Sequence, residues 1–136
     1  MNIKLATPKD AFEMLKNQKN SFLVDVRTNE EFNFVGMVDA SQFENRILLN
    51  PWQVLPQMQL NPNFSNNLTS QIPLDATLFF LCKTGGRSAQ SAEFALGLGY
   101  QNCYNVVNGF EGDLNDNSQR GTINGWKASN LPWRQR

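Results

Sequence analysis

The chain has 136 residues and a net charge of zero, because 12 Lys and Arg balance 12 Asp and Glu. This length is typical of one domain with a single hydrophobic core. A neutral chain lacks the global basic field that recruits nucleic acid or an anionic membrane surface, so we expect neither partner. No apolar run is long enough to span a bilayer or to form the core of a signal peptide, which predicts a cytoplasmic location.

Histidine is absent and there are two cysteines, Cys82 and Cys103. The lack of histidine excludes mechanisms that need an imidazole base and zinc sites that need histidine ligands. Two thiols do not make a disulfide framework in a chain of this size, which fits a reducing compartment. Cys103 lies in Asn102–Val106, which is predicted to be a short buried strand, and is interpreted as a buried structural residue, with a resolving role as the alternative.

Capping residues mark the first two helices that the sequence predicts. Thr7 followed by Pro8 is typical of a helix N-terminus, and the helix is expected to end between Asn17 and Asn20. Phe22–Val26 is a predicted buried strand. Thr28 with Glu31 three residues later forms a capping-box pattern that predicts a helical turn through about Phe34.

The middle of the chain is less clearly patterned. Met37–Val38 is a candidate short strand, and Ile47–Leu49 fits either a strand or core residues beside a turn. Pro51–Val54 is a candidate helix start that Pro56 would cut short. The polar stretch Asn61–Asn67 predicts turns, followed by room for a short helix.

The apolar run Thr77–Leu81 is the predicted central strand, and Ser88–Leu98 is a predicted helix with Gly97 or Gly99 as its C-terminal cap. This alternation of helix and strand predicts an α/β domain with a mostly parallel central sheet. Residues 111–121 are polar and rich in turn formers, which predicts an ordered surface loop. We expect apolar anchors in the tail to attach residues 111–136 to the same single domain, 1–136; these anchors are Trp126, Leu131, Pro132 and Trp133.

The loop between that strand and helix carries the chemistry. Cys82 ends the strand, and Lys83, Thr84, Gly85, Gly86, Arg87 and Ser88 follow it. Thiolates are stabilised by cations, N–H donors and helix N-termini, and this loop can supply all three around an exposed sulfur. The two glycines allow positive φ or a close backbone approach. The alternative is an inert buried cysteine beside an ordinary strand-to-helix turn.

The stretch Cys82–Ala89 resembles the active-site loop of the rhodanese family of sulfurtransferases. Three further segments resemble the family's early strand and helix, its last strand and turn, and its terminal segment: Leu23–Phe32, Asn105–Phe110 and Gly125–Trp133. The resemblance implies a rhodanese-like three-layer domain, with a mostly parallel sheet flanked by helices.

It also implies a double displacement through a persulfide on Cys82. The sulfur would come from thiosulfate or a similar small anionic donor and pass to a thiol, cyanide or a protein acceptor. The amides of Lys83 through Ser88 would cradle the persulfide, and Lys83 and Arg87 would attract the donor. The resemblance implies no metal and no organic cofactor.

Asp25 and Arg27 match the family's early Asp-x-Arg segment, which implies a supporting role beside the active site. The alternative is ordinary capping at the strand end, with Arg27 paired to Glu30 or Glu31 in solvent. The chain departs from the family at Gly36–Met37, where many relatives carry glycine and histidine, and at Asp39, near a usual glycine.

Two other functions remain open. A phosphatase or arsenate reductase of related fold would also use a cysteine and an arginine in an anion-binding loop. Loops of that kind place five residues between the two, whereas four separate Cys82 from Arg87. The other is a non-catalytic binding module or a sulfur relay to a dedicated protein partner.

Overall fold

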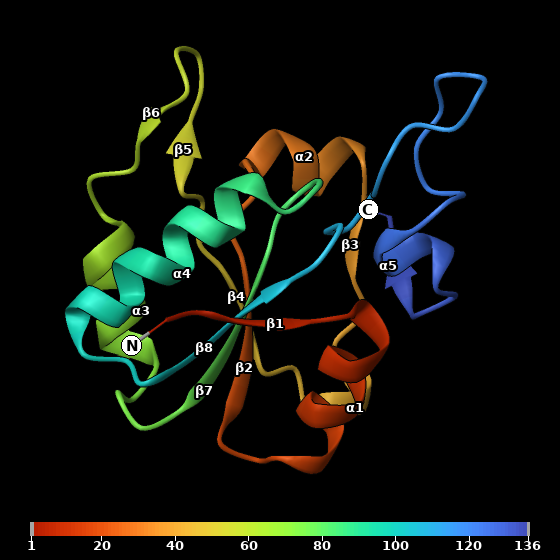
Figure 1. Cartoon of the computed structure of the whole chain (residues 1–136). Helices are drawn as coiled ribbons and strands as arrows, with labels where there is room; N and C mark the ends of the chain where they lie inside the picture. Colours follow the sequence, from red (N-terminus) through yellow and green to blue (C-terminus); the bar gives the residue numbers. More distant parts are fainter. Residues whose placement is uncertain (1, 136) are drawn as a thin grey trace.

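A five-stranded sheet forms the centre of the molecule, with strand order β1-β8-β7-β2-β4 (Figure 1). The computed structural model describes residues 2–135. All neighbours in this sheet pair in parallel. The strands are β1 (Lys4–Ala6), β2 (Ser21–Asp25), β4 (Ile47–Leu49), β7 (Thr77–Leu81) and β8 (Asn102–Val106).

Helices cover both faces of the sheet (Figure 1). One face carries α1 (Pro8–Asn17), the 3-10 helix η1 (Ser41–Phe43) and α5 (Gly125–Ala128), and the other carries α3 (Phe64–Gln71) and α4 (Gly86–Leu98). The predicted three-layer α/β fold with a parallel sheet is therefore confirmed.

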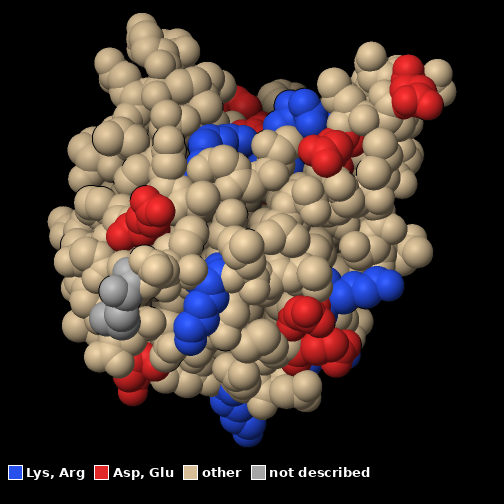
Figure 2. Space-filling view, in the orientation of Figure 1, with Lys and Arg blue, Asp and Glu red and all other residues tan. Residues whose placement is uncertain are grey.

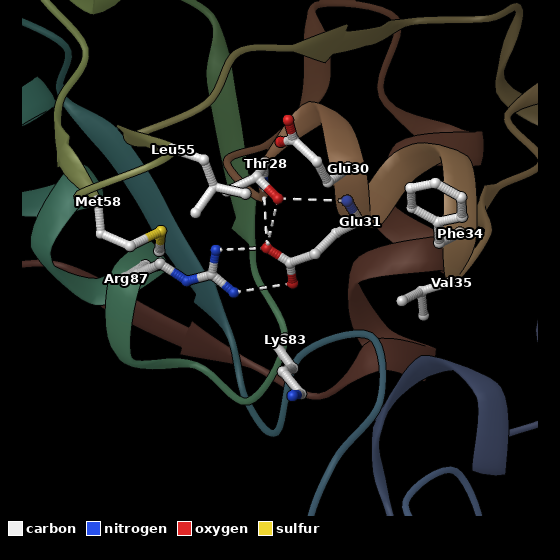
Figure 3. A pocket seen from close by; sticks show the side chains of 9 residues that line it. All are labelled: Thr28, Glu30, Glu31, Phe34, Val35, Leu55, Met58, Lys83 and Arg87. Atoms are coloured by element: carbon white, nitrogen blue, oxygen red, sulfur yellow. Dashed lines mark hydrogen bonds and ion pairs between the residues drawn. The ribbon is translucent and has the colours of Figure 1, made fainter.

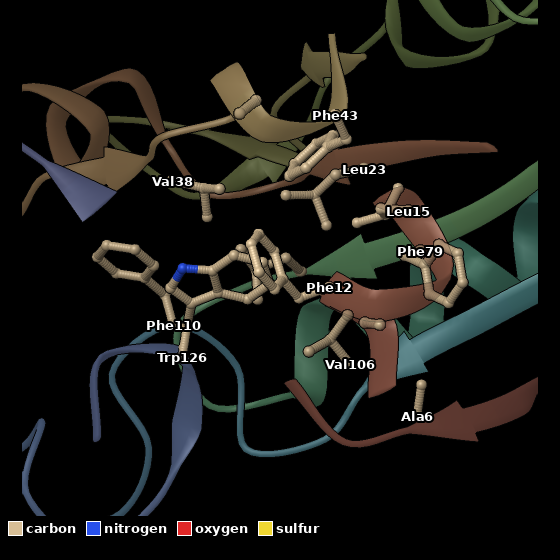
Figure 4. Packing of buried hydrophobic residues seen from close by; sticks show 13 residues of the cluster. Ala6, Phe12, Leu15, Leu23, Val38, Phe43, Phe79, Val106, Phe110 and Trp126 are labelled. Atoms are coloured by element: carbon tan, nitrogen blue, oxygen red, sulfur yellow. The ribbon is translucent and has the colours of Figure 1, made fainter. Parts of the chain in front are cut away.

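Side chains of the central strands alternate between two apolar clusters because successive residues of a strand face opposite sides. Phe79 and Leu81 join the cluster that contains Phe12 and Trp126, shown in Figure 4. Leu78 and Phe80 join the other, with residues of α3 and α4. Burial on both faces explains why β7 is apolar throughout.

The caps that the sequence marks are present. Thr7 accepts a hydrogen bond from the N–H of Asp10 at the start of α1, with proline in the first turn. Thr28 and Glu31 form the full capping box of α2 (Asn29–Phe34), and Gly99 ends α4 in the left-handed region. The predictions for these helix ends are confirmed.

The middle of the chain differs from expectation at several places. The helix expected at Pro51–Val54 is wrong, because β5 (Gln53–Val54) pairs antiparallel with β6 (Gln59–Leu60) in a projecting hairpin. Ile47–Leu49 is a strand, β4. Helix α3 begins at Phe64, inside the stretch expected to form turns, and β1 is a strand that the sequence did not reveal.

The C-terminal segment returns to the body of the domain. Trp126 is fully buried, its indole N–H donates to the carbonyl of Pro132 at 2.9 Å, and its ring meets Phe12 edge-on. Strand β9 (Trp133–Arg134) pairs antiparallel with β3 (Met37–Val38). Trp133 remains 39% exposed, so Trp126 is the deeper of the two tryptophans.

Within residues 2–135, none of the helices has the length and apolar character needed to cross a membrane.

Parallel pairing brings the carboxyl ends of the strands to one edge of the sheet. Asp25 of β2 lies opposite Leu81 of β7, so the chain leaves both strands at the same edge of the sheet. Ligands of open parallel sheets bind outside this carboxyl edge.

Candidate active site

The loop from Cys82 to Gly85 connects β7 to α4 at the carboxyl edge of the sheet. Its base is fixed by the turn that follows β8. The N–H of Phe110 donates to the carbonyl of Cys82 at 2.8 Å, and the N–H of Glu111 donates to that of Lys83 at 3.0 Å. A Cβ on Gly109 would meet the carbonyl oxygen of Cys82 at 2.4 Å, so only glycine allows this approach. The loop thus rises from a backbone-bonded base.

The sulfur of Cys82 lies beneath the loop. The residue is only 1% exposed, so the expectation of an exposed nucleophile is wrong. The sulfur accepts a hydrogen bond from the N–H of Gly85 at 3.1 Å, and the hydroxyl of Ser88 lies 3.2 Å away. The loop therefore turns one N–H donor toward the sulfur as it shields it.

The two glycines play different parts. Gly85 has φ of 115° and caps α4, which places it where other residues are strained. Gly86 lies in the first turn of α4 without positive φ, and a Cβ there would meet nothing within 4 Å. The expectation that both glycines are needed for the backbone path is correct for Gly85 only.

Asn105 of β8 completes the surroundings of the sulfur. Its side-chain amide donates to the carbonyl of Gly85 at 3.2 Å, and its Oδ1 accepts from the hydroxyl of Ser88 at 2.5 Å. Sequence reasoning did not single it out as a site residue. The signal was a polar residue in a stretch interpreted as a buried strand, and its 7% exposure shows that it is buried.

Arg87 faces Glu31 of α2. Its two terminal nitrogens donate to the two carboxylate oxygens at 2.7 and 3.0 Å (Figure 3). Burial opposes the charge of Glu31, but hydrogen bonds from Arg87 and Thr28 outweigh it and hold the pKa of Glu31 below its usual value. Burial likewise opposes the charge of Arg87, and the bond to Glu31 outweighs it, so the pKa of Arg87 lies above its usual value. Arg87 is therefore engaged by a carboxylate, not open to an incoming anion as expected.

A pocket of about 450 Å³ lies over this ion pair (Figure 3). Its lining combines apolar and charged side chains: Thr28, Glu30, Glu31, Phe34, Val35, Leu55, Met58, Lys83 and Arg87. Figure 2 shows basic and acidic groups close together in the hollow between the two projecting segments at the top of the molecule. Lys83 lines the pocket and Thr84 is exposed, so two predicted loop residues border open space.

Asp25 and Arg27 form a buried ion pair, with no exposure of either side chain. Nη2 of Arg27 donates to Oδ2 of Asp25 at 2.8 Å and to the carbonyl of Gly36 at 2.9 Å. The guanidinium also lies 4.3 Å from the ring centre of Phe110. The alternative of a solvent pair between Arg27 and Glu30 or Glu31 is wrong. The pair instead ties the end of β2 to the turn that supports the loop Cys82–Gly85.

Cys103 is buried in β8, and burial raises its pKa to about 11. A thiol with this pKa is almost entirely protonated at neutral pH, and the protonated form is a poor nucleophile. This favours the structural interpretation of Cys103.

Comparisons with known proteins agree with this geometry. A parallel sheet covered by helices on both faces, with a loop of this kind at its carboxyl edge, defines a rhodanese-like domain. The rhodanese-like domain protein of Staphylococcus aureus superposes with a TM-score of 0.55 at 24% identity over 79% of this chain and 87% of that one. The polysulfide-sulfur transferase homodimer of Wolinella succinogenes gives a TM-score of 0.66 at 19% identity, covering 98% of this chain and 80% of that chain. Identities this low show the fold alone.

The family is more specific. Residues 3–136 match the model of the STR4 middle domain, and the chain belongs to that family. A Rickettsia rickettsii protein described as the uncharacterized protein RP600 homolog is 40% identical over 135 residues, which cover 98% of each chain. The crystal structure of Rv0390 from M. tuberculosis gives a TM-score of 0.91 at 38% identity and covers both chains fully.

Replacing Gly85 by alanine is expected to destabilise the fold by about 1–2 kcal/mol, because its φ of 115° is unfavourable for an L side chain. Gly86→Ala is the matched control and is expected to be neutral or slightly stabilising, since its Cβ meets open space and alanine favours helix. Urea unfolding of both variants measures the difference. Equal destabilisation by the two would contradict the assignment of the strained position to Gly85.

Asp25→Ala is expected to cost about 3–5 kcal/mol, because it leaves the buried guanidinium of Arg27 without its carboxylate. Glu44→Ala removes a carboxylate that lies 3.8 Å from Arg46 on the surface, and it is expected to change stability by less than about 0.5 kcal/mol. Thermal and urea unfolding compare the two. A small effect of Asp25→Ala would show that the buried pair is dispensable.

Proposed function

We propose that the protein is a sulfurtransferase that carries sulfane sulfur as a persulfide on Cys82. The observation that carries the proposal is the sulfur of Cys82 at the carboxyl edge of the sheet, with the N–H of Gly85 donating to it at 3.1 Å. A donor of this kind stabilises negative charge on sulfur as it develops. The family and the rhodanese-like fold support the class of reaction.

The reaction balances without a general base. The thiolate of Cys82 attacks the outer sulfur of thiosulfate or a similar donor, the donor's sulfur–sulfur bond breaks, and sulfite leaves with the bonding electron pair. An acceptor thiolate or cyanide then attacks the outer sulfur of the persulfide and releases Cys82 as thiolate. Each step exchanges one sulfur bond for another, so the reaction needs no net proton transfer, metal or redox cofactor.

Burial of Cys82 sets a requirement on this chemistry. At 1% exposure, the sulfur can meet a donor only when the covering loop moves. Thr84 and Gly86 are exposed at the top of the loop, whereas Cys82 and Lys83 are bonded at its base. Movement is therefore expected to begin at Thr84, because the carbonyl of Gly85 is held by Asn105 and Gly86 belongs to α4.

Lys83 is the cation that we propose to meet an anionic donor first. It lines the pocket beside Arg87, whose charge is matched by Glu31. The acceptor is a thiol, cyanide or a partner protein. The Wolinella neighbour bears the name polysulfide-sulfur transferase, which supports sulfur as the transferred group. A cytoplasmic location and a single domain spanning 1–136 stay predictions.

One alternative has an observation in its favour. The near-complete burial of Cys82 also fits a domain that binds a partner or receives sulfur from a dedicated protein, without free turnover. Phosphatase or arsenate chemistry is less well supported, because four residues separate Cys82 from Arg87 and the guanidinium is held by Glu31.

Incubation with thiosulfate is expected to add the mass of one sulfur atom to the protein at Cys82. Cys82→Ser is expected to abolish the addition, while Cys103→Ser, a change of the second buried thiol, retains it. Intact-protein and peptide mass spectrometry give the result. An unmodified wild-type protein, under conditions that label a known sulfurtransferase, would favour the binding module, and preferential release of phosphate from an aryl phosphate would favour the phosphatase.

Glu31→Gln is expected to lower the KM for thiosulfate by roughly tenfold, because it releases a charged hydrogen-bonding partner of Arg87. Glutamine keeps a side-chain oxygen for the capping box with Thr28. Glu30→Gln is the matched control, since it removes the same charge from the same helix and pocket without touching the Arg87 pair. Steady-state kinetics with cyanide as acceptor measure both. Equal changes in the two variants would show that only the overall charge matters.

A further inference from the structure

The hydroxyl group of Ser88 has one proton and three acceptors within reach. Its oxygen lies 3.2 Å from the sulfur of Cys82, 2.5 Å from Oδ1 of Asn105 and 3.1 Å from the carbonyl of Gly85. A hydroxyl donates one hydrogen bond at a time and accepts others through its lone pairs. These acceptors therefore compete for a single proton.

Of the three acceptors, Oδ1 of Asn105 is the best placed to accept the hydrogen bond from the hydroxyl of Ser88. Its amide nitrogen donates to the carbonyl of Gly85, which fixes the side-chain orientation so that Oδ1 faces Ser88. The oxygen–oxygen contact of 2.5 Å is also at the short end for a hydrogen bond between oxygens, whereas 3.2 Å is an ordinary contact for the larger sulfur atom. With its proton on this bond, Ser88 presents only lone pairs to Cys82, which suits a protonated thiol that donates to them.

A thiolate needs the opposite arrangement. The negative sulfur has no proton to donate, so a lone pair of Ser88 facing it is repulsive, whereas the hydroxyl proton would stabilise it. Turning the hydroxyl toward the sulfur breaks the bond to Asn105 and leaves Oδ1 with one donor fewer. Ionisation of Cys82 is thereby linked to a side chain of another strand.

We propose that Asn105 is a positioning residue that competes with Cys82 for the hydroxyl proton of Ser88 and so limits the thiolate at rest. When Cys82 ionises, its proton leaves to solvent and the hydroxyl of Ser88 rotates from Asn105 to the sulfur. The same amide of Asn105 holds Gly85, whose N–H faces that sulfur. One side chain therefore controls two donors of the site.

Under the proposed function, the rotation of the Ser88 hydroxyl has a role in sulfur transfer. Only this role rests on the proposed function. In a persulfide, the charge lies mainly on the outer sulfur, and the sulfur bonded to Cβ no longer needs the proton of Ser88. The hydroxyl then returns to Asn105. The hydrogen bond between Ser88 and Asn105 is thus present in the thiol and persulfide states and broken in the thiolate.

The pH dependence of alkylation tests the proposal without any sulfur transfer. The wild-type and variant proteins, each carrying Cys103→Ser, are treated with iodoacetamide from pH 5 to 10, and modification of Cys82 is followed by mass spectrometry. Asn105→Leu is expected to lower the pH midpoint by about one unit, because the hydroxyl of Ser88 then loses its shortest acceptor and only the carbonyl of Gly85 still competes with the thiolate. Ser88→Ala is expected to raise it by a similar amount.

The combined variant makes the test decisive. In the Ser88→Ala background, Asn105→Leu has no hydroxyl proton to release and is expected to give no downward shift, because it then acts only by loosening Gly85, whose N–H donates to the sulfur. Asn102→Leu alters the other end of β8, where Asn102 contacts Lys4, and is the matched control that should leave the midpoint in place. Asn105→Ala has the same expected sign and replaces the leucine variant if that one fails to fold.

Two results would overturn the proposal. One is an upward or absent shift for Asn105→Leu in a folded protein, and the other is the same downward shift with and without Ser88. Neither depends on the mass gain from thiosulfate, so a protein that takes up no sulfur can still show the coupling. Conversely, sulfur transfer with no coupling would leave the proposed function standing and remove the role of Asn105.

Discussion

The left-handed backbone of Gly85 is the constraint on which the site depends. With φ of 115°, this residue ends the loop, caps α4 and turns its N–H back toward the sulfur of Cys82. A residue with a Cβ would be strained there, and the loop would lose the turn that covers the sulfur. This turn brings together the side chains around the sulfur, and the contacts among Cys82, Ser88 and Asn105 depend on it.

The sulfur of Cys82 is shielded from solvent and at the same time faced by hydrogen-bonding groups. Burial keeps Cys82 from solvent, while the N–H of Gly85 donates to its sulfur and the hydroxyl of Ser88 lies beside it. The ion pair between Arg87 and Glu31 holds the guanidinium in a bidentate contact. The site is therefore closed around the sulfur, and under the proposed function a sulfur donor can reach it only after the loop moves.

Short sequence patterns predicted the helix caps. Contacts between residues that are distant in the sequence became visible only in the fold. Thr7 and Thr28 mark helix starts through their own chemistry, so sequence alone placed them, and the structure chose Gly99 over Gly97 as the cap that ends α4. The partner of Arg87 was missed because Glu31 lies 56 residues away, and the capping box had already explained it. Two-residue strands such as β5 carry too few residues for a period, and the role of Asn105 depends on the register between β7 and β8.

The turn after β8 holds the loop through main-chain groups alone. The N–H groups of Phe110 and Glu111 bond the carbonyls of Cys82 and Lys83, and any residue except proline offers such an N–H. The side chain of Phe110 is nevertheless fixed by its burial beside the guanidinium of Arg27, whereas that of Glu111 is partly exposed. Residue 111 can therefore change at the rim of the site while the main chain under Cys82 keeps its path.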